Sequence, residues 1–325
     1  MKKVIISILS LAMTAYMAVP AFADNTADVQ GKYKAGAESP VTIFADITWE
    51  DMTFNYTEGE KTWNPETHQV DQADGKWNSD TKAITVTNHS NVGIMAKFAF
   101  APNGEIEGSF TKDSTPTDQL ALDTIKNLEE GSAAPSDTMN FGITNGTISE
   151  NGKLGTITVY IAPNDGNNYV FMETELTEAA EKGGSFKLAN DLYINDRIII
   201  SKGNFEIDLN GKSINCSGGF DLRDAIHKIS NGTINSIGSN ECLMSSYYGN
   251  TIVDSCKLTS STYYAVYVCL GSTATVKDST LTGLSYSYGA AIADGENAVL
   301  TFVGSNIING NVKVRGGGKV VFSGN

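Results

Sequence analysis

The stretch Leu209-Asn210-Gly211-Lys212-Ser213-Ile214 decides the fold, because its pattern returns at regular intervals along the rest of the chain. Each copy has an apolar residue, four mostly small or polar residues, and a second apolar residue. The copies begin at residues 209, 229, 253, 276, 302 and 322, so the intervals are 20, 24, 23, 26 and 20 residues, and the last copy is partial. A repeat of this length, with Asn and Gly at its bends, predicts one coil of a β-helix per copy.

The apolar positions of the repeat are expected to form two buried columns, because a single coil cannot bury its own inward row. The first column would contain Leu209, Ile229, Val253, Val276, Phe302 and Phe322, and the second Ile214, Ile234, Leu258, Leu281 and Ile307. Parallel stacking is the favoured interpretation. An antiparallel sandwich built from the same strands is the alternative that the pattern leaves open.

A short helix is predicted at 174–182, directly before the repeats. Thr174 can serve as its N-cap, and Gly183-Gly184 would end it. Leu176, Ala179 and Ala180 share one face. The first coil of a solenoid exposes both its core and its strand edges, so we expect this helix to cover that coil.

The opening of the repeat region resembles that of pectate-lyase-like right-handed parallel β-helix domains. The matching phrases are Glu173–Leu176 with Ala179-Ala180 and Lys182–Gly184, then Phe186–Leu192, then Phe205–Ile214. The resemblance continues more loosely to Asn325 and implies a right-handed parallel β-helix over 169–325. It implies lyase chemistry poorly, because many such domains in exported surface proteins are noncatalytic.

The preceding residues, 41–168, are predicted to form a β-sandwich-like domain, so the chain as a whole is expected to be all-β. Clusters of turn residues separate short β-rich runs, and one helical stretch is expected near Thr117–Leu128. The runs lie at 41–49, 52–57, 83–88, 93–100, 139–143 and 155–161. The phrases Thr62–His68, Trp77 and Ile84–Asn91 resemble leading β-sandwich modules of exported proteins from Gram-positive gut bacteria.

The first 23 residues have the pattern of an export signal. Lys2 and Lys3 precede an apolar run at 4–19, and Ala21-Phe22-Ala23 is a typical cleavage site. Residues 24–40 are predicted to be a flexible lead. We therefore expect an extracellular protein, secreted or associated with the cell surface, that does not insert into the membrane after cleavage.

The charge of the chain disfavours nucleic acid as a partner. The formal net charge is −14, and removal of the two signal lysines makes it −16. A chain this acidic lacks the basic surface that binds phosphate backbones.

Four cysteines, Cys216, Cys242, Cys256 and Cys269, occur about once per coil. An even number in an exported chain permits disulfides. Small buried residues fit the spacing equally well, and we favour that interpretation.

Tyrosines gather in the predicted loops of the coils, where they would form an aromatic surface suited to a glycan or a surface protein. Packing of the loops onto the flank of the coils explains them equally well. The candidate ligand-binding residues are Tyr247, Tyr248, Tyr263, Tyr264, Tyr267, Tyr286 and Tyr288.

Catalysis is the runner-up hypothesis. Asp221, Arg223 and Asp224 are the best acid–base cluster for a polysaccharide lyase or glycoside hydrolase acting on acidic polysaccharide, although a solvated turn explains them better. Asp254 and Asp278 are expected to stack on adjacent coils at the position of Asn210, where they could bind calcium. No metal site and no other cofactor are predicted.

The first half offers weaker candidates. His68 and His89, with Asp46 or Glu66, lack the spacing of known metal motifs and are expected to be polar loop residues. Trp49, Trp63 and Trp77 could form a sugar-stacking platform but are more often core residues.

The sequence therefore predicts a noncatalytic, exported β-helix protein that acts in adhesion or binds a glycan or protein. One further expectation concerns the last coil, which has no cap after Phe322. Its open edge predicts either end-to-end association with another copy or a chain that continues past Asn325.

Overall fold

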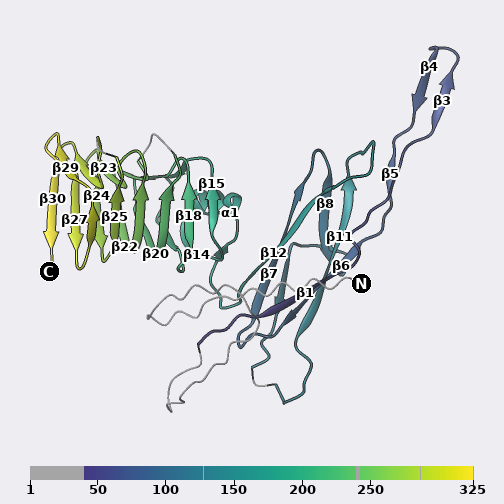
Figure 1. Cartoon of the computed structure of the whole chain (residues 1–325), viewed down its shortest axis with the longest axis horizontal. Coiled ribbons are helices and arrows are strands. Elements are labelled where there is room, and N and C mark those ends of the chain that lie inside the picture. Colours follow the sequence, from purple (N-terminus) through teal and green to yellow (C-terminus); the bar gives the residue numbers. More distant parts are fainter. Residues whose placement is uncertain (1–39, 127, 239–241, 286, 325) are drawn as a thin grey trace. The chain divides into compact units, whose positions relative to one another are not determined.

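The computed structural model describes residues 40–126, 128–238, 242–285 and 287–324 (Figure 1). The predicted signal and nearly all of the predicted lead fall within 1–39, outside these residues. The chain divides into two compact units between Asp165 and Gly166. No helix in the described parts of the chain is both long and apolar enough to cross a membrane.

The first unit is a sandwich of two antiparallel sheets. The strands of one sheet are, in order, β1 (Ala45–Trp49), β6 (Lys82–Asn88), β11 (Ser136–Asn145), β8 (Glu107–Lys112) and β9 (Thr115–Pro116). The other sheet contains β10 (Gln119–Leu122), β7 (Ile94–Pro102) and β12 (Gly155–Pro163). Alternate residues of these strands form one buried core, which includes Ile84, Phe98 and Phe141.

The prediction of a helix near Thr117–Leu128 is wrong. Residues 119–122 form β10, which pairs antiparallel with β7, and no helix is assigned among the described residues of that stretch. Leu120 and Leu122 are both buried, while the residues beside them are exposed. This period of two fits a half-buried strand, and tertiary packing has overridden the helical propensity of Gln, Leu and Ala.

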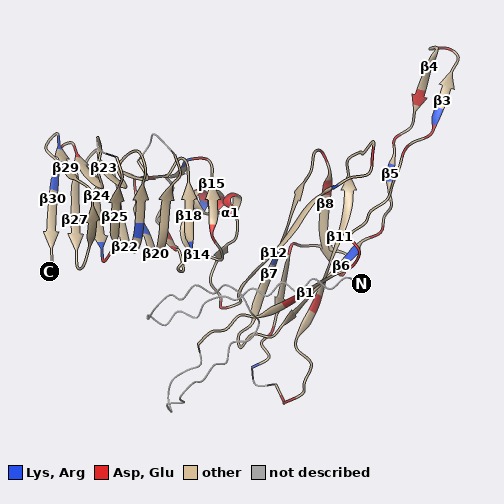
Figure 2. Ribbon diagram, viewed as in Figure 1, with Lys and Arg blue, Asp and Glu red and all other residues tan. Residues whose placement is uncertain are grey.

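The run expected at 52–57 contributes only β2 (Tyr56–Thr57), which pairs with β5 (Lys76–Trp77). Beyond it, β3 (Lys61–Asn64) and β4 (Gln69–Gln72) form a two-stranded ribbon that extends away from the sandwich (Figure 1). Figure 2 shows a basic residue in β3 and an acidic one in β4, and most of the ribbon is exposed.

The second unit is a right-handed parallel β-helix, as the sequence predicts. Every strand pair in it is parallel, so the antiparallel alternative does not occur among its described strands. Each coil passes through three strand positions, which we call the first, second and third faces.

The first face contains β14 (Gly184–Leu188), β17 (Phe205–Asp208), the first half of β20 (Ile226–Ser236), the first half of β22 (Asn250–Ser260), β24 (Thr273–Lys277), β27 (Val299–Val303) and β30 (Lys319–Ser323); β13 (Tyr169–Val170) pairs with β14. The second face contains β15 (Leu192–Ile194), β18 (Ser213–Cys216), the second halves of β20 and β22, β25 (Thr280–Gly283) and β28 (Ile307–Asn309). The third face contains β16 (Ile198–Ile200), β19 (Phe220–Arg223), β21 (Met244–Tyr247), β23 (Val266–Cys269), β26 (Ala291–Asp294) and β29 (Val312–Arg315).

The two apolar columns exist, with corrections in both. In the first, Phe322 pairs with Phe302 as predicted, but in the last coil it is 66% exposed and not buried. Ile207, not Leu209, pairs with Ile229, because the bend after β17 is two residues longer than the bend inside β20. Likewise Ile308, not Ile307, pairs with Leu281, because the last bend gains one residue; Ile307 is 59% exposed. A shift of one residue in a strand reverses the side chain's direction, so the one-residue insertion exposes Ile307, whereas the two-residue insertion leaves Leu209 buried.

The bend between the first and second faces repeats a left-handed residue in each coil. Asn231, Ser255, Asp278 and Gly304 have φ values of 59°, 56°, 47° and 71°. Asn, Asp and Gly tolerate this conformation better than most residues do. The Asn and Gly of the repeat are therefore explained by the backbone of this bend.

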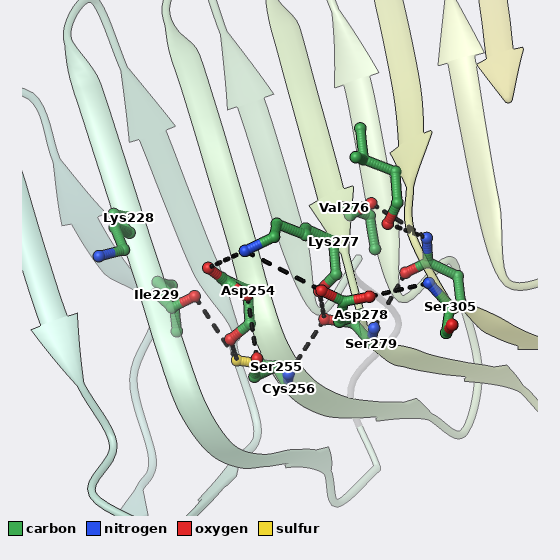
Figure 3. Close-up of polar contacts among 12 residues, drawn as sticks. Lys228, Ile229, Asp254, Ser255, Cys256, Val276, Lys277, Asp278, Ser279 and Ser305 are labelled. Carbon is green, nitrogen blue, oxygen red and sulfur yellow. Dashed lines mark hydrogen bonds and ion pairs between the residues drawn. The ribbon is translucent and has the colours of Figure 1, made fainter. Parts of the chain in front are cut away.

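The expected stacking of Asp254 on Asp278 is wrong. Asp254 lies beside Lys277 of the next coil, whose Nζ is 3.3 Å from Asp254 Oδ2 and 3.9 Å from Asp278 Oδ2 (Figure 3). Asp278 Oδ1 accepts a hydrogen bond from the backbone N–H of Ser305 at 2.8 Å. A lysine thus lies between the two carboxylates that we considered for calcium.

The predicted cap helix is α1 (Glu173–Lys182), but Thr174 is not its N-cap. That position is Met172, whose side chain makes no capping hydrogen bond; instead Glu175 Oε2 accepts from the backbone N–H of Phe171 at 2.7 Å. Leu176, Ala179 and Ala180 are buried in the same core as the first coil. The helix ends at Gly183, where φ is 69°.

The four cysteines are buried and unpaired. Burial raises the pKa of each thiol to about 11. They pack as small residues in or beside the coil core.

Candidate functional site

The outward side of the third face carries the candidate site. Strand pairing places Asp221, Ser245, Tyr267 and Ile292 in one outward row across four consecutive strands. The loops that lead from the second face to the third cover part of this row. Between loops and strands lies a cavity of about 600 Å³, lined by Arg197, Asp221, Cys242, Ser245, Tyr247, Tyr263, Tyr264, Tyr267, Tyr288, Ile292 and Arg315.

Four tyrosines form the aromatic wall of the cavity. The rings of Tyr263 and Tyr288 are stacked, with centroids 3.8 Å apart and an interplanar angle of 21°. Tyr264 stands at 81° to both, and its ring is 6.3 Å from that of Tyr267. Because these rings also pack on Cys242 and Ile292, they hold the loops on the coils as well as line the cavity.

A second hollow, of about 620 Å³, lies on the same loops and shares Tyr263 and Tyr288 with the first. Its other lining residues are mainly hydroxylated: Ser261, Thr262, Leu284, Ser285 and Ser287. The stacked tyrosine pair therefore borders two adjoining hollows. Such an arrangement can hold neighbouring units of a chain-like ligand.

At one end of the cavity, Asp221 lies between two arginines. Arg197 Nη2 is 2.5 Å from Asp221 Oδ1 and donates to Ser245 Oγ at 3.0 Å, while Nη1 donates to the carbonyl of Gly218 at 2.5 Å. Arg223 Nη2 is 2.8 Å from the other oxygen of Asp221. The Asp221 side chain is only 7% exposed, so this charge depends on its partners.

At the other end, Asp294 joins Arg315 and Tyr267. Arg315 Nε donates to Asp294 Oδ1 at 2.9 Å, its Nη2 donates to Oδ2, and the Tyr267 hydroxyl donates to Oδ2 at 2.9 Å. The hydrogen bonds from Arg315, and then from Tyr267, lower the pKa of the Asp294 carboxyl. Burial, followed by the bond to Asp294, raises the pKa of Tyr267.

The site is basic although the chain is acidic. Arg197, Arg223 and Arg315 are the only arginines in the sequence, and all three lie on or directly before third-face strands at the cavity. Lys313 adds a fourth positive charge, with its Nζ 6.0 Å from the centroid of the Tyr264 ring. Asp221 pairs with Arg197 and Arg223, and Asp294 pairs with Arg315.

The structure places most of the predicted site residues at the cavity. This shows where they lie and does not test what they do. Tyr247, Tyr263, Tyr264, Tyr267 and Tyr288 line the cavity together with Asp221, and Arg223 lies over the Tyr247 ring at 5.6 Å. Tyr248, in contrast, is 64% exposed and does not line it.

Two other predicted residues lie apart. Asp224 occupies the next bend with φ of 59° and is not part of the lining. Tyr286 falls outside the described residues.

Sequence reasoning missed Arg315, Asp294 and the pairing role of Arg197. The rarity of arginine was a usable signal, because this chain has 20 lysines and places its three arginines on one face. The register of the third face could not be read from the sequence. The loops before it differ in length from coil to coil, so the repeat pattern does not extend to its strands.

The candidates of the first unit do not converge. His89 Nε2 lies 3.3 Å from Asp46 Oδ2 on the surface, and His68 is exposed with φ of 53°. Trp77 donates its indole N–H to the carbonyl of Gly146 at 2.7 Å, whereas Trp63 is 59% exposed on the ribbon.

Trp49 and Trp77 both pack against the margin of the sandwich core, whereas Trp63 lies on the exposed ribbon, so the three tryptophans form no common platform. In the described parts of the chain, no group of three or more His, Cys, Asp or Glu residues is placed to hold a metal ion.

No protein-family model matches the chain, and no curated protein matches it. Among solved structures, the catalytic unit of a thermostable GH87 α-1,3-glucanase from Streptomyces thermodiastaticus strain HF3-3 aligns with 84% of this chain and 69% of its own, at 11% identity and a TM-score of 0.24. The catalytic domain of a GH87 α-1,3-glucanase variant in complex with nigerose aligns with 86% of this chain and 68% of its own, at 12% identity and a TM-score of 0.20. These values are too low to support a statement about activity.

Proposed function

We propose that the cavity of the third face binds an acidic glycan without cleaving it, and that the protein acts outside the cell as a binding or adhesion module. The observation that carries this proposal is that two of the three arginines of the chain, Arg197 and Arg315, line a single tyrosine-lined cavity, while the third, Arg223, contacts its lining residues Asp221 and Tyr247. Tyrosine rings pack against the apolar faces of sugars, and guanidinium groups recognise carboxylates in a fixed two-pronged geometry.

The charge balance supports an anionic ligand. Asp221 and Asp294 orient the three arginines, and Lys313 adds a further positive charge beside the Tyr264 ring. The rest of the chain is strongly acidic, so this is where an anion meets the least repulsion. A guanidinium held by a carboxylate keeps its planar fork in place, which lowers the entropy lost on binding.

The same pairing disfavours hydrolysis. A glycosidase acid must hold a proton near neutral pH, which requires a raised pKa. The pKa of Asp294 is instead lowered by Arg315 and Tyr267. Asp221 gives both of its oxygens to arginines. Neither carboxyl has the surroundings of a general acid.

Calorimetric titration with polygalacturonate, an acidic polymer, and with dextran, a neutral one, tests the proposal. Binding of polygalacturonate is expected, with no new unsaturated ends and no new reducing ends. Tyr263→Ala should weaken it about fivefold, because stacking contributes about 1 kcal/mol beyond area burial. Tyr248→Ala is the matched control, an exposed tyrosine outside the cavity, and should change nothing.

Arg315→Ala and Arg315→Lys separate charge from geometry. Both should weaken binding of the acidic polymer, the lysine variant less, because lysine keeps the charge but loses the fork. Appearance of unsaturated ends would favour the lyase hypothesis instead. If neither polymer binds, glycan binding by this cavity is overturned.

A further inference from the structure

The first unit contains a cavity of its own, of about 810 Å³, which is independent of the proposed glycan site. Strands of both sheets supply one part of its wall: β1 and β11 from one sheet, β7 and β12 from the other. Two segments without strands, 50–55 and 146–154, supply the rest. Segment 50–55 leads directly into β2, so the cavity lies at the end of the sandwich from which the ribbon extends (Figure 1).

Both sheets have local features that shape this cavity. In one sheet, β11 pairs with β6 only as far as Phe141, and its pairing with β8 becomes irregular between Ile143 and Asn145. Such bulges bend a strand and are frequent beside binding sites. In the other sheet, a Cβ at Gly155 would lie 2.4 Å from the Phe100 ring, so the glycine allows this ring to lie against β12. An irregular strand and a position without a side chain therefore border the open space.

The wall is mainly apolar, which indicates the kind of ligand that it fits. Protein interiors leave few voids larger than a water molecule, whereas sites for small molecules have about 300–1,000 Å³ and are lined by apolar and aromatic side chains. Most of the apolar wall residues are only half-buried, so an apolar ligand would remove further surface from water. The apolar wall residues are Trp49, Met52, Phe54, Phe100, Phe141, Ile143, Ile148, Leu154 and Ile157.

One charge lies in this wall, and it is positive. Lys153 is the single charged residue among the described residues that line the cavity, although the chain as a whole has a net charge of −14. It is exposed, so it lies at the rim, where a charged group keeps its contact with water. Thr53, Asn55 and Asn151 are also exposed lining residues and can donate hydrogen bonds. An apolar molecule with one anionic head group complements both the wall and its rim.

We propose that this cavity binds a long-chain carboxylate. The apolar chain lies between the two sheets, against Phe100 and Phe141, and the carboxylate pairs with Lys153 at the rim. Trp49 lines the same space, so its indole contacts the bound chain. A sugar would fit poorly here, because an apolar wall leaves its hydroxyl groups without hydrogen-bond partners.

Quenching of tryptophan fluorescence in the full chain by dibrominated stearate locates the ligand, because bromine quenches an indole that it contacts. Saturable quenching is expected. Trp49→Phe should remove most of it. Trp63→Phe is the matched control, the same substitution at an exposed tryptophan of the ribbon, and should leave the quenching of the remaining tryptophans intact. Circular dichroism verifies that both variants fold. Absence of saturable quenching overturns the proposal, as does quenching that Trp49→Phe leaves undiminished.

Displacement of the brominated ligand by laurate and by dodecanol tests the head group, because the two have chains of equal length and differ in charge. Lys153→Glu should weaken laurate at least about fivefold, since it replaces an attraction by a repulsion, and should leave dodecanol unchanged. Lys126→Glu makes the same change at an exposed lysine outside the cavity and should affect neither ligand. If Lys153→Glu changes the two ligands alike, or changes neither, an anionic ligand paired with Lys153 is ruled out.

Discussion

Arg197 and Asp221 are 24 residues apart in sequence, yet their side chains meet at 2.5 Å because the third-face strands that follow and contain them, β16 and β19, are paired in parallel. Ile199, and not Arg197, is the strand partner of Asp221, so the arginine reaches it from the preceding turn. The contact therefore joins two successive coils and fixes one end of the cavity.

Removal of the Asp221 carboxylate should destabilise the protein strongly. Asp221→Ala removes an ion-pair partner of the largely buried Arg197 guanidinium, and breaking a buried pair by removing one partner costs about 3–5 kcal/mol. Urea unfolding should show that loss. Asp254→Ala removes a half-buried carboxylate paired with the exposed Lys277 and should cost about 1 kcal/mol or less. Equal losses in the two variants would contradict the buried role of Asp221.

The corrected second column predicts that two apolar residues at equivalent positions of the sequence repeat contribute very differently to stability. Leu281 is fully buried, and Leu281→Ala should lower the free energy of unfolding by about 2–5 kcal/mol. Ile307, which the simple repeat places in the same column, is exposed, and Ile307→Ala should change it by about 0.5 kcal/mol or less. A large effect at Ile307 would show that the register of β28 is wrong.

The coil repeat was predictable because its causes are local. Inward apolar residues recur on both sides of a bend, and the bend itself demands a left-handed residue such as Asn231 or Gly304. The errors arose where a bend gained residues, after Ile207 and before Ile308. Two extra residues change the strand partner but leave Leu209 buried, whereas one extra residue exposes Ile307.

The candidate site was predictable only in part, for a different reason. Tyr263 and Tyr264 stand out as a loop pair in the sequence, but what they meet is decided by pairing across coils. Arg315 reaches Asp294 only because β26 and β29 are neighbours. Composition identifies the residue types, whereas the contacts depend on loop lengths that a single sequence does not constrain.

The cysteines should resist modification in the native protein. Burial raises the pKa of each to about 11, so near pH 8 only about one thiol in a thousand is ionised, and access is blocked as well. A thiol reagent should therefore react slowly until denaturant is added and then titrate four thiols. Tyr248→Cys supplies an exposed positive control that should react at once. Fewer than four thiols in the denatured, unreduced protein would reveal a disulfide.

His227 should make the β-helix less stable in mild acid. Its ring is fully buried, Nε2 lies 3.0 Å from the carbonyl of Arg223, and Nδ1 has no hydrogen-bond partner. Burial lowers the pKa of His227 below its ordinary value of about 6.5, although the bond to Arg223 and the charge of Asp224 act in the opposite direction.

The sign of the effect follows from which state binds the proton. Above about pH 6.5 the imidazole is neutral in both states, so it adds no pH dependence. Below that value the imidazole binds a proton in the unfolded chain but not in the folded chain. The free energy of unfolding therefore falls as the pH is lowered, by at most about 1.4 kcal/mol per pH unit, until the lowered pKa of the folded state is reached.

His227→Leu isolates this contribution from that of the carboxylates, which titrate in both proteins. Urea unfolding at about pH 7.5 and about pH 5 should show a smaller loss of stability in the variant than in the parent. At the higher pH the two proteins should differ little, because leucine removes the unpaired Nδ1 but also leaves the Arg223 carbonyl without its bond to Nε2, and each unpaired buried group costs about 1–3 kcal/mol. If both proteins lose the same stability between the two pH values, the imidazole is not held neutral in the core.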